Sequence, residues 1–190
     1  MYIFFDTETS GLPKRWDAPA SDFNNWPRIV QLAWVCCDEN GNQTSEQVRL
    51  IKPDGFTIEP GAAKVHGIST QYAIENGEPL EPILKEFGAA VEASSLLVAH
   101  NIDFDRKIAG AEFLRASLPN VLDDIRRSCT MTESTNYCKL PGRYGYKWPT
   151  LDELHRKLFN KSFSGAHDAS ADCAACMRCF FKLKELGYVS

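Results

Sequence analysis

The sequence predicts an α/β protein in which helices flank one mixed β-sheet. Three stretches within residues 1–51 have the length and apolar character of strands, and Asn40-Gly41 between two of them is a strong hairpin signal. From residue 80 onward most apolar residues take a helical spacing, interrupted by one short apolar strand at 96–99. Hairpin-linked strands followed by alternating helix and strand are typical of a sheet that contains both antiparallel and parallel pairs.

The expected strands are short, and the first two are largely apolar. The first is an apolar run that ends at Asp6, and the second follows a stretch without clear periodicity. The third alternates between apolar and polar side chains, which is the pattern of a half-buried strand. We therefore place the strands at residues 2–5, 29–37, 46–51 and 96–99.

Helices are expected where apolar residues spaced three and four apart form one stripe. Thr150 is the expected N-cap of the third helix, and the last helix begins near Asp168 with Cys173 and Cys176 facing inward. The expected helices span 80–91, 104–114, 151–158 and 168–183. Residues 13–27 and 137–148 lack this periodicity and are predicted to be long loops, which are often functional.

Length and composition limit the class of protein. A chain of 190 residues is expected to form one domain, residues 1–190, whose core needs no disulfide. The 21 Lys and Arg against 25 Asp and Glu give a net charge of −4, which argues against a broad basic face for duplex DNA. No apolar run reaches the ~18 residues of a membrane span, and no signal peptide is evident. We expect a cytoplasmic protein that binds no membrane and whose seven cysteines are reduced.

Two carboxylates at the end of the first strand form the first candidate site. Asp6 and Glu8 are two residues apart, so in a strand both side chains point to the same face. Like charges side by side raise each other's pKa unless a cation lies between them, and Mg²⁺ prefers such oxygen ligands. In the alternative interpretation residues 7–11 form a polar turn in which Glu8 is solvated, and this segment alone leaves both open.

A second acidic group, Asp103 and Asp105, follows the strand at 96–99. Functional groups of open α/β sheets collect beyond strand ends, which makes this group a candidate. The alternative is that Asn101 or Asp103 simply caps the helix that follows, and one of the two aspartates can do so while the other stays free for a metal. We expect Asp103 to be the cap and Asp105 to be the metal ligand, with Phe104 packed inward between them.

The third group consists of His167 and Asp172. Their spacing of five does not put them on one face of a regular helix. Both can reach one site if His167 lies in a loop and Asp172 in the first turns of the last helix. The N-terminus of that helix also favours negative ligands such as phosphate. The alternative is that His167 is an ordinary surface or core histidine.

Taken in order, the three groups match a known pattern. Phe5-Asp-Thr-Glu-Thr-Ser-Gly-Leu12, His100-Asn-x-x-Phe-Asp105 and His167-x4-Asp172 resemble the three motifs of the DEDD-type 3′→5′ exonucleases, and the last is that of the DEDDh subgroup. Val65-His-Gly-Ile68 and Leu151-x-x-Leu154 also resemble segments of the family that includes the proofreading subunit of bacterial replicative DNA polymerase and its stand-alone relatives. The resemblance extends from residue 2 to about residue 186.

The resemblance implies an RNase H-like fold, with a mixed five-stranded sheet flanked by helices. It implies a 3′→5′ exonuclease that hydrolyses phosphodiester bonds at the 3′ end of single-stranded or frayed DNA and releases nucleoside 5′-monophosphates. An exoribonuclease or oligoribonuclease of the same family is the alternative. His167 would accept the proton of the attacking water. Two divalent ions, Mg²⁺ or Mn²⁺, would be held by Asp6, Glu8, Asp105 and Asp172.

The resemblance also implies substrate contacts and partners. Leu12 would wedge against the terminal base, unless it is an ordinary turn residue. The other motif residues expected to contact substrate are Thr7, Thr9, His100 and Asn101. The expected partners are the 3′ end of single-stranded DNA or RNA and, in a replicative complex, a DNA polymerase subunit. Replication, repair and RNA processing stay open, because a fold alone does not choose among them.

The remaining features have competing interpretations. The Lys, Arg, Tyr and Trp residues of 137–148 suit single-strand binding, or else a solvated loop with its aromatic residues packed beneath. Cys173-x2-Cys176-x2-Cys179 lacks the second ligand pair of a zinc site, so we expect it in the core, and we expect His66 and His155 to be structural. An aspartyl phosphatase and a non-catalytic nucleic-acid-binding module are weaker alternatives, because neither accounts for the complete set of acidic motifs.

Overall fold

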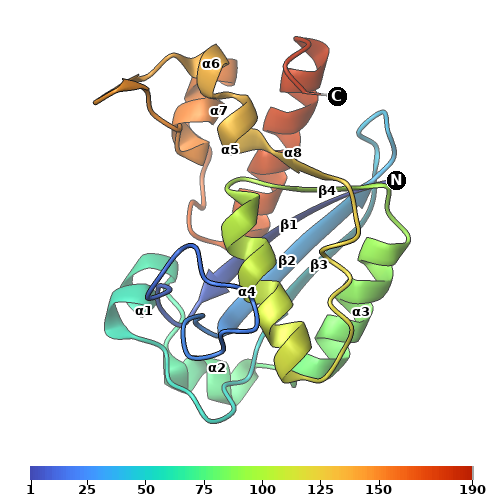
Figure 1. The fold of residues 1–190 in the computed structure, drawn as a ribbon, viewed down its shortest axis with the longest axis vertical. Helices are drawn as coiled ribbons and strands as arrows, with labels where there is room; N and C mark the ends of the chain where they lie inside the picture. Colours follow the sequence, from blue (N-terminus) through green and yellow to red (C-terminus); the bar gives the residue numbers. More distant parts are fainter. Residues whose placement is uncertain (190) are drawn as a thin grey trace.

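A computed structural model describes residues 1–189 and has a five-stranded sheet at its centre (Figure 1). The strand order is β3-β2-β1-β4-β5. The pairs β1·β2 and β2·β3 are antiparallel, whereas β1·β4 and β4·β5 are parallel, so the predicted mixed sheet is confirmed. The strands are β1 Tyr2–Thr9, β2 Ile29–Cys37, β3 Gln43–Leu50, β4 Leu96–Ala99 and β5 Arg127–Cys129.

The ends of the strands differ from the sequence-based expectation in two places. β1 does not stop before Asp6, because its pairing with β2 continues to Thr9, which pairs with Ile29. The polar turn proposed as the alternative for residues 7–11 is therefore wrong for its first half. β5 gives no sequence signal, since it has only three residues and includes two polar ones. The hairpin at Gly41 is as expected, with a φ of 87° that glycine adopts without strain.

The four predicted helices are present, and two have clear N-terminal caps. The Thr150 hydroxyl accepts from the Glu153 N–H, and the Glu153 carboxylate accepts from the Thr150 N–H, which forms a capping box. Asp168 accepts from the backbone N–H groups of Ser170 and Ala171. The helices are α3 Leu80–Glu92, α4 Ile102–Arg115, α7 Leu151–Phe159 and α8 Ala169–Glu185.

Six short elements were not predicted, because each is too short to show a repeated spacing of apolar residues. They are α1 Pro60–His66, α2 Thr70–Asn76, α5 Thr130–Glu133, α6 Thr135–Cys138, β6 Pro141–Gly142 and β7 Gly145–Tyr146. The hairpin of β6 and β7 projects from the body of the molecule (Figure 1). Tyr144 is 90% exposed and Trp148 64% exposed, so these aromatic residues are not packed beneath the loop.

Helices cover both faces of the sheet (Figure 1). Side chains alternate along β1, so Ile3 and Phe5 belong to the core with α3 and α4, while Phe4 packs against α8 on the opposite face. Cys173 and Cys176 of α8 are buried beside Phe4 as free thiols, which confirms their assignment to the core. This alternation decides which face each carboxylate of β1 occupies.

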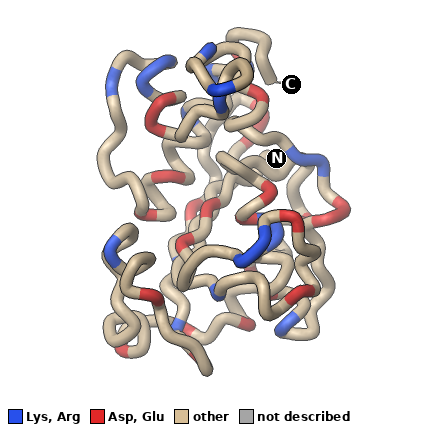
Figure 2. Tube along the Cα trace, turned by 60° about the vertical axis from the view of Figure 1, so that its left-hand side comes forward, with Lys and Arg blue, Asp and Glu red and all other residues tan. Residues whose placement is uncertain are grey.

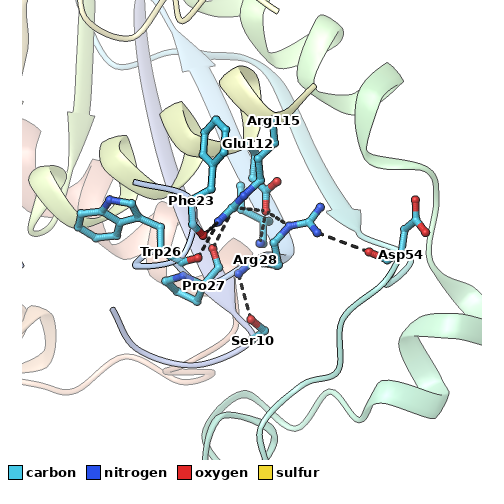
Figure 3. Close-up of polar contacts among 9 residues, drawn as sticks. Ser10, Phe23, Trp26, Pro27, Arg28, Asp54, Glu112 and Arg115 are labelled. Carbon is cyan, nitrogen blue, oxygen red and sulfur yellow. Dashed lines mark hydrogen bonds and ion pairs between the residues drawn. The ribbon is translucent and has the colours of Figure 1, made fainter. Parts of the chain in front are cut away.

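A buried carboxylate fixes the β1–β2 loop to α4. Glu112 of α4 is fully buried, and its Oε1 accepts from Arg28 Nε at 2.7 Å and from the Ile29 N–H at 3.1 Å (Figure 3). Arg115 Nη1 lies 3.2 Å from the same oxygen, and Arg115 Nη2 donates to the Trp26 carbonyl at 2.7 Å. Two guanidinium groups therefore compensate one buried negative charge.

Hydrogen bonds within the predicted loop at 13–27 join its two ends. Asn25 closes it, since its side chain accepts from the Arg15 N–H at 2.7 Å and donates to the Arg15 carbonyl at 2.9 Å. The Trp26 indole donates to the Pro19 carbonyl at 2.9 Å, and Ala18 is fully buried. The loop thus holds its side chains in fixed positions beside α4.

The surface is mixed in charge. Lys and Arg are spread among Asp and Glu rather than gathered on one face (Figure 2), as the net charge of −4 suggests. The outer strand β3 is polar and mostly exposed, and its Arg49 pairs with Glu86 at 2.9 Å and Glu78 at 3.7 Å. None of the helices in the described part of the chain has the length and apolar character that crossing a bilayer requires.

Candidate active site

Three carboxylates meet where the end of β1 faces the start of α8. Asp6 and Glu8 follow Phe4 at steps of two along β1, so they point to the same face as Phe4, the face that α8 covers. Asp172 lies in the first turn of α8. One oxygen from each carboxylate lies within 4.8 Å of the others, which is close enough to share one cation.

Asp105 approaches the same strand from the other face of the sheet. It is a buried residue in the first turn of α4, and its Oδ1 accepts from the Thr7 N–H at 3.0 Å and the Thr7 hydroxyl at 2.7 Å. Thr7 lies between Asp6 and Glu8 on β1 and points to the α4 side. Asp105 is therefore not in the three-carboxylate group, but its charge raises the pKa of both Asp6 and Glu8.

The electrostatics of this site are unfavourable without a cation. Burial, followed by the Asp172 carboxylate, raises the pKa of Glu8 to about 8. Burial and then Asp105 hold the pKa of Asp6 well above its ordinary value. Burial also raises the pKa of Asp172 to about 6. Every neighbouring charge that acts on Glu8 is negative, so the donor set fits a hard divalent cation.

His167 lies beside this group in the loop before α8. Its backbone has a φ of 69°, and its N–H donates to Asp172 Oδ2 at 2.9 Å. The expected arrangement, His167 in the loop and Asp172 in the first turn of α8, is present. Burial lowers the pKa of His66, and the His167 imidazole lowers it further.

An apolar pocket of about 330 Å³ adjoins the carboxylates. Leu12, which is 71% exposed, and Phe104 line it together with Glu8 and Thr9. The pocket therefore places apolar side chains beside the carboxylates. Its remaining wall is formed by Thr7, Gly11, Glu59, Gly61, Ala62, Val65 and His66.

Sequence reasoning missed part of this pocket. His66 has a structural hydrogen bond, since its Nε2 lies 3.3 Å from the Thr9 carbonyl, but it also lines the pocket. Val65 is 55% exposed at the same wall. The Val65-His-Gly-Ile68 segment was the available signal, because it resembles a segment of the exonuclease family.

Some of the predicted substrate contacts have other partners. The ring of His100 is engaged at both nitrogens, by the Thr130 hydroxyl and the Pro149 carbonyl, each at 3.0 Å, and burial lowers its pKa to about 4. Thr9 donates its hydroxyl to the Gly11 carbonyl at 2.7 Å. The side chains of His100 and Thr9 thus stabilise the backbone around the site through intramolecular hydrogen bonds.

The start of α4 corrects one prediction. Asn101, with a φ of 70°, is the N-cap residue, and Asp103 is not the cap. The left-handed backbone at Asn101 turns the chain into the helix without a side-chain cap. Asp103 is instead exposed in the first turn, 3.5 Å from Arg106 Nη2.

The family model described as exonuclease (RNase_T) matches residues 3–180. The chain is 30% identical over 124 residues to DNA polymerase III PolC-type of Streptococcus sanguinis, an alignment covering 65% of the chain and 8% of the relative. It is 28% identical over 176 residues to DNA polymerase III subunit epsilon of Buchnera aphidicola, which covers 90% of the chain and 67% of that subunit.

Solved structures share the fold. Exonuclease I of E. coli in complex with a dA16 oligonucleotide superimposes with a TM-score of 0.77 at 23% identity, over 97% of this chain and 40% of that one. The zinc-bound form of the exonuclease I complex with single-stranded DNA gives the same TM-score at 24% identity. The RNase H-like sheet that the sequence predicts is therefore confirmed, and the chain spans 40% of exonuclease I and 8% of the PolC-type polymerase.

Proposed function

Because the chain belongs to the exonuclease family whose model matches residues 3–180, we propose that it is a metal-dependent 3′→5′ exonuclease. Its substrate is single-stranded DNA or the frayed 3′ end of a duplex, and its product is a nucleoside 5′-monophosphate. The observation that carries this proposal is the group formed by Asp6, Glu8 and Asp172, whose oxygens lie within 4.8 Å of one another.

We propose that Asp6, Glu8 and Asp172 hold divalent ions from the α8 side and that Asp105 completes the site from the α4 side. Thr7 holds one oxygen of Asp105 and so fixes the orientation of that carboxylate. Two ions, Mg²⁺ or Mn²⁺, would stabilise the charge on the attacking and leaving oxygens of the phosphodiester. In this proposal the four carboxylates are catalytic residues as well as ligands.

The other groups of the site bind the substrate and move a proton. His167 accepts the proton of the attacking water, because its loop lies against the Asp172 carboxylate. Leu12 and Phe104 contact the terminal base in the 330 Å³ pocket. Thr7 positions Asp105, and His100 positions the strand end and the loop before α7. Asn101 turns the chain into α4 and so sets the direction from which Asp105 approaches.

The names of the relatives favour DNA over RNA as the substrate. Two are DNA polymerase III proteins, and exonuclease I is described in complex with an oligodeoxynucleotide. A role in replication, with a polymerase subunit as partner, follows most directly from these names, and repair is the alternative. An exoribonuclease or oligoribonuclease is the second candidate, since the carboxylate group acts on the phosphate and not on the sugar.

The test is digestion of oligomers labelled at either end, in DNA and RNA, with Mg²⁺, Mn²⁺ or EDTA. We expect stepwise loss from the 3′ end with either metal, no reaction in EDTA, and faster cleavage of DNA. His167→Asn should abolish most of the activity, whereas Glu39→Gln, an exposed acid on the β2–β3 turn, should be fully active. Activity that persists in EDTA, or cleavage that starts from the 5′ end, would overturn the proposal.

A further inference from the structure

A second apolar groove, of about 480 Å³, lies beside the terminal-base pocket. Phe104 lines both of them, so the two hollows adjoin at one aromatic side chain. The walls of the groove come from four separate segments: the loop 13–27, the start of α4, α5 and the segment after the β6–β7 hairpin. The side chains that matter are Trp16, Trp26, Phe104, Lys107, Met131 and Trp148.

Two tryptophans of this groove, Trp16 and Trp148, are not core residues. Trp16 is 56% exposed and Trp148 is 64% exposed, although tryptophan is among the side chains that gain most from burial. The Trp16 ring lies 5.5 Å from the Phe104 ring, with 37° between their planes. The two rings are therefore tilted against each other rather than stacked in parallel.

The position of Trp16 is fixed by a basic residue. Lys107 of α4 donates to the Trp16 carbonyl at 2.8 Å, and its Nζ lies 5.5 Å from the centre of the Trp26 ring. Lys107 thus brings a positive charge to the groove and at the same time holds the loop. The acid at the rim, Asp103, lies 3.5 Å from Arg106, so its charge is partly compensated.

We propose that this groove binds one or two unpaired bases of the substrate strand, immediately 5′ of the terminal nucleotide. The proposal rests on the proposed function, since it needs a 3′ end in the adjoining pocket. Continuity through Phe104 gives the path of the strand, and Lys107 complements its phosphates. Stacking on indole rings requires a base whose faces are free, so the groove selects single-stranded ends without reading sequence.

The test separates binding in the groove from chemistry at the carboxylates. The p-nitrophenyl ester of thymidine 5′-monophosphate fills only the terminal pocket, whereas oligothymidylates of two to six residues also reach the groove. For the wild-type protein, KM should fall as the second and third residues are added and then level off. Trp16→Ala and Trp148→Ala should each raise KM for the trimer about 5- to 100-fold, with kcat and hydrolysis of the ester unchanged.

Two controls exclude a structural explanation. Trp148→Phe, which keeps a ring, should recover most of the affinity lost in Trp148→Ala. Tyr144→Ala removes a ring that is 90% exposed between β6 and β7 and does not line the groove, so it should leave KM for the trimer unchanged. Melting temperatures of all variants within a few degrees of the wild type would show that the fold is intact.

Binding can also be located without turnover. In EDTA, 2-aminopurine placed next to the 3′ terminus should be quenched by the indoles, and Trp148→Ala should remove that quenching. Unchanged KM for the trimer in both tryptophan variants, or an equal loss with ester and trimer, would overturn the groove proposal. Failure of the wild-type protein to cleave either the ester or the oligomers would instead overturn the proposed exonuclease function.

Discussion

The buried carboxylate of Glu112 and the carboxylate group of Asp6 and Glu8 have opposite surroundings. Glu112 is fully buried, yet its Oε1 lies within 3.2 Å of the guanidinium groups of both Arg28 and Arg115. Asp6 and Glu8 are only partly buried, yet the charges that act on Glu8 are other carboxylates. A charge removed from water needs a compensating partner. Glu112 finds it within the protein, whereas the charges that act on Asp6 and Glu8 are all negative, as expected of the metal site proposed above.

The largest expected effect separates the two groups by activity and stability. Asp6→Asn should lower exonuclease activity by about a thousandfold, ~4 kcal/mol in activation free energy, as loss of a single electrostatic catalytic group does. In EDTA the same variant should be at least as stable as the wild type, because a repulsive charge is gone. Cleavage of labelled oligomers measures the activity, and urea unfolding in EDTA measures the stability. Loss of stability together with activity would mean that Asp6 is structural.

Glu112→Gln should show the reverse behaviour. Removing the buried negative charge leaves two guanidinium groups without compensation, and we expect a loss of about 3 kcal/mol in the free energy of unfolding. The activity of the folded fraction should remain close to that of the wild type, since Glu112 lies outside the pocket and the carboxylate group. Urea titrations and initial rates below the unfolding transition test this. Unchanged stability would contradict the comparison.

The pH dependence of stability should distinguish the groups next. Because the pKa of Glu8 is raised from 4.5 to about 8 in the folded protein, the folded chain holds protons that the unfolded chain has released. The free energy of unfolding without metal should therefore fall as pH rises from about 4.5 to 8, by an amount on the order of 2 kcal/mol after allowance for solvent around Glu8.

The measurement compares wild type with Glu8→Gln in EDTA at pH 5 and pH 8. Taking the difference removes the opposite contribution of His100, whose lowered pKa makes stability fall as pH drops from about 6.5 toward 4. The wild type should lose stability relative to Glu8→Gln at pH 8, and Mg²⁺ should restore it. A difference that is independent of both pH and Mg²⁺ would show that the site does not need a cation.

The smallest expected effect comes from a pair that water already solvates. Lys85 Nζ lies 2.6 Å from Glu81 Oε1 on α3, and both side chains are more than half exposed. Lys85→Gln keeps the helix propensity and should cost less than about 0.5 kcal/mol, falling to nothing in high salt. Urea unfolding at low and high ionic strength measures it. A cost comparable with that of Glu112→Gln would remove the distinction between buried and exposed pairs.

The regular elements could be predicted because each leaves a repeated signal. The apolar steps of α3, the N-cap at Thr150 and the Asn40-Gly41 hairpin are local, and the structure has all three. The face of β1 that carries Asp6 and Glu8 also follows from its period of two. Features that depend on neighbouring residues could therefore be predicted from the sequence.

The features that were missed depend on contacts between distant segments. The Arg28–Glu112 pair joins residues 84 positions apart, and the bond between Thr7 and Asp105 joins residues 98 apart. His66 acquires its place in the pocket only when α1 packs beside the end of β1. The cap of α4 was misassigned because the left-handed backbone at Asn101 replaces a side-chain cap, and residue type alone does not give that conformation.

The edge strand β3 also affects how this protein can associate with other chains. A free edge strand can add a strand from a neighbour and so begin aggregation. On β3, Glu46 accepts from the Gln43 amide and the Ser170 hydroxyl, and Arg49 is held by Glu86. An incoming strand would have to desolvate these charges. Growth of the sheet across molecules through β3 is thus disfavoured, and a protein partner would have to dock elsewhere on the molecule.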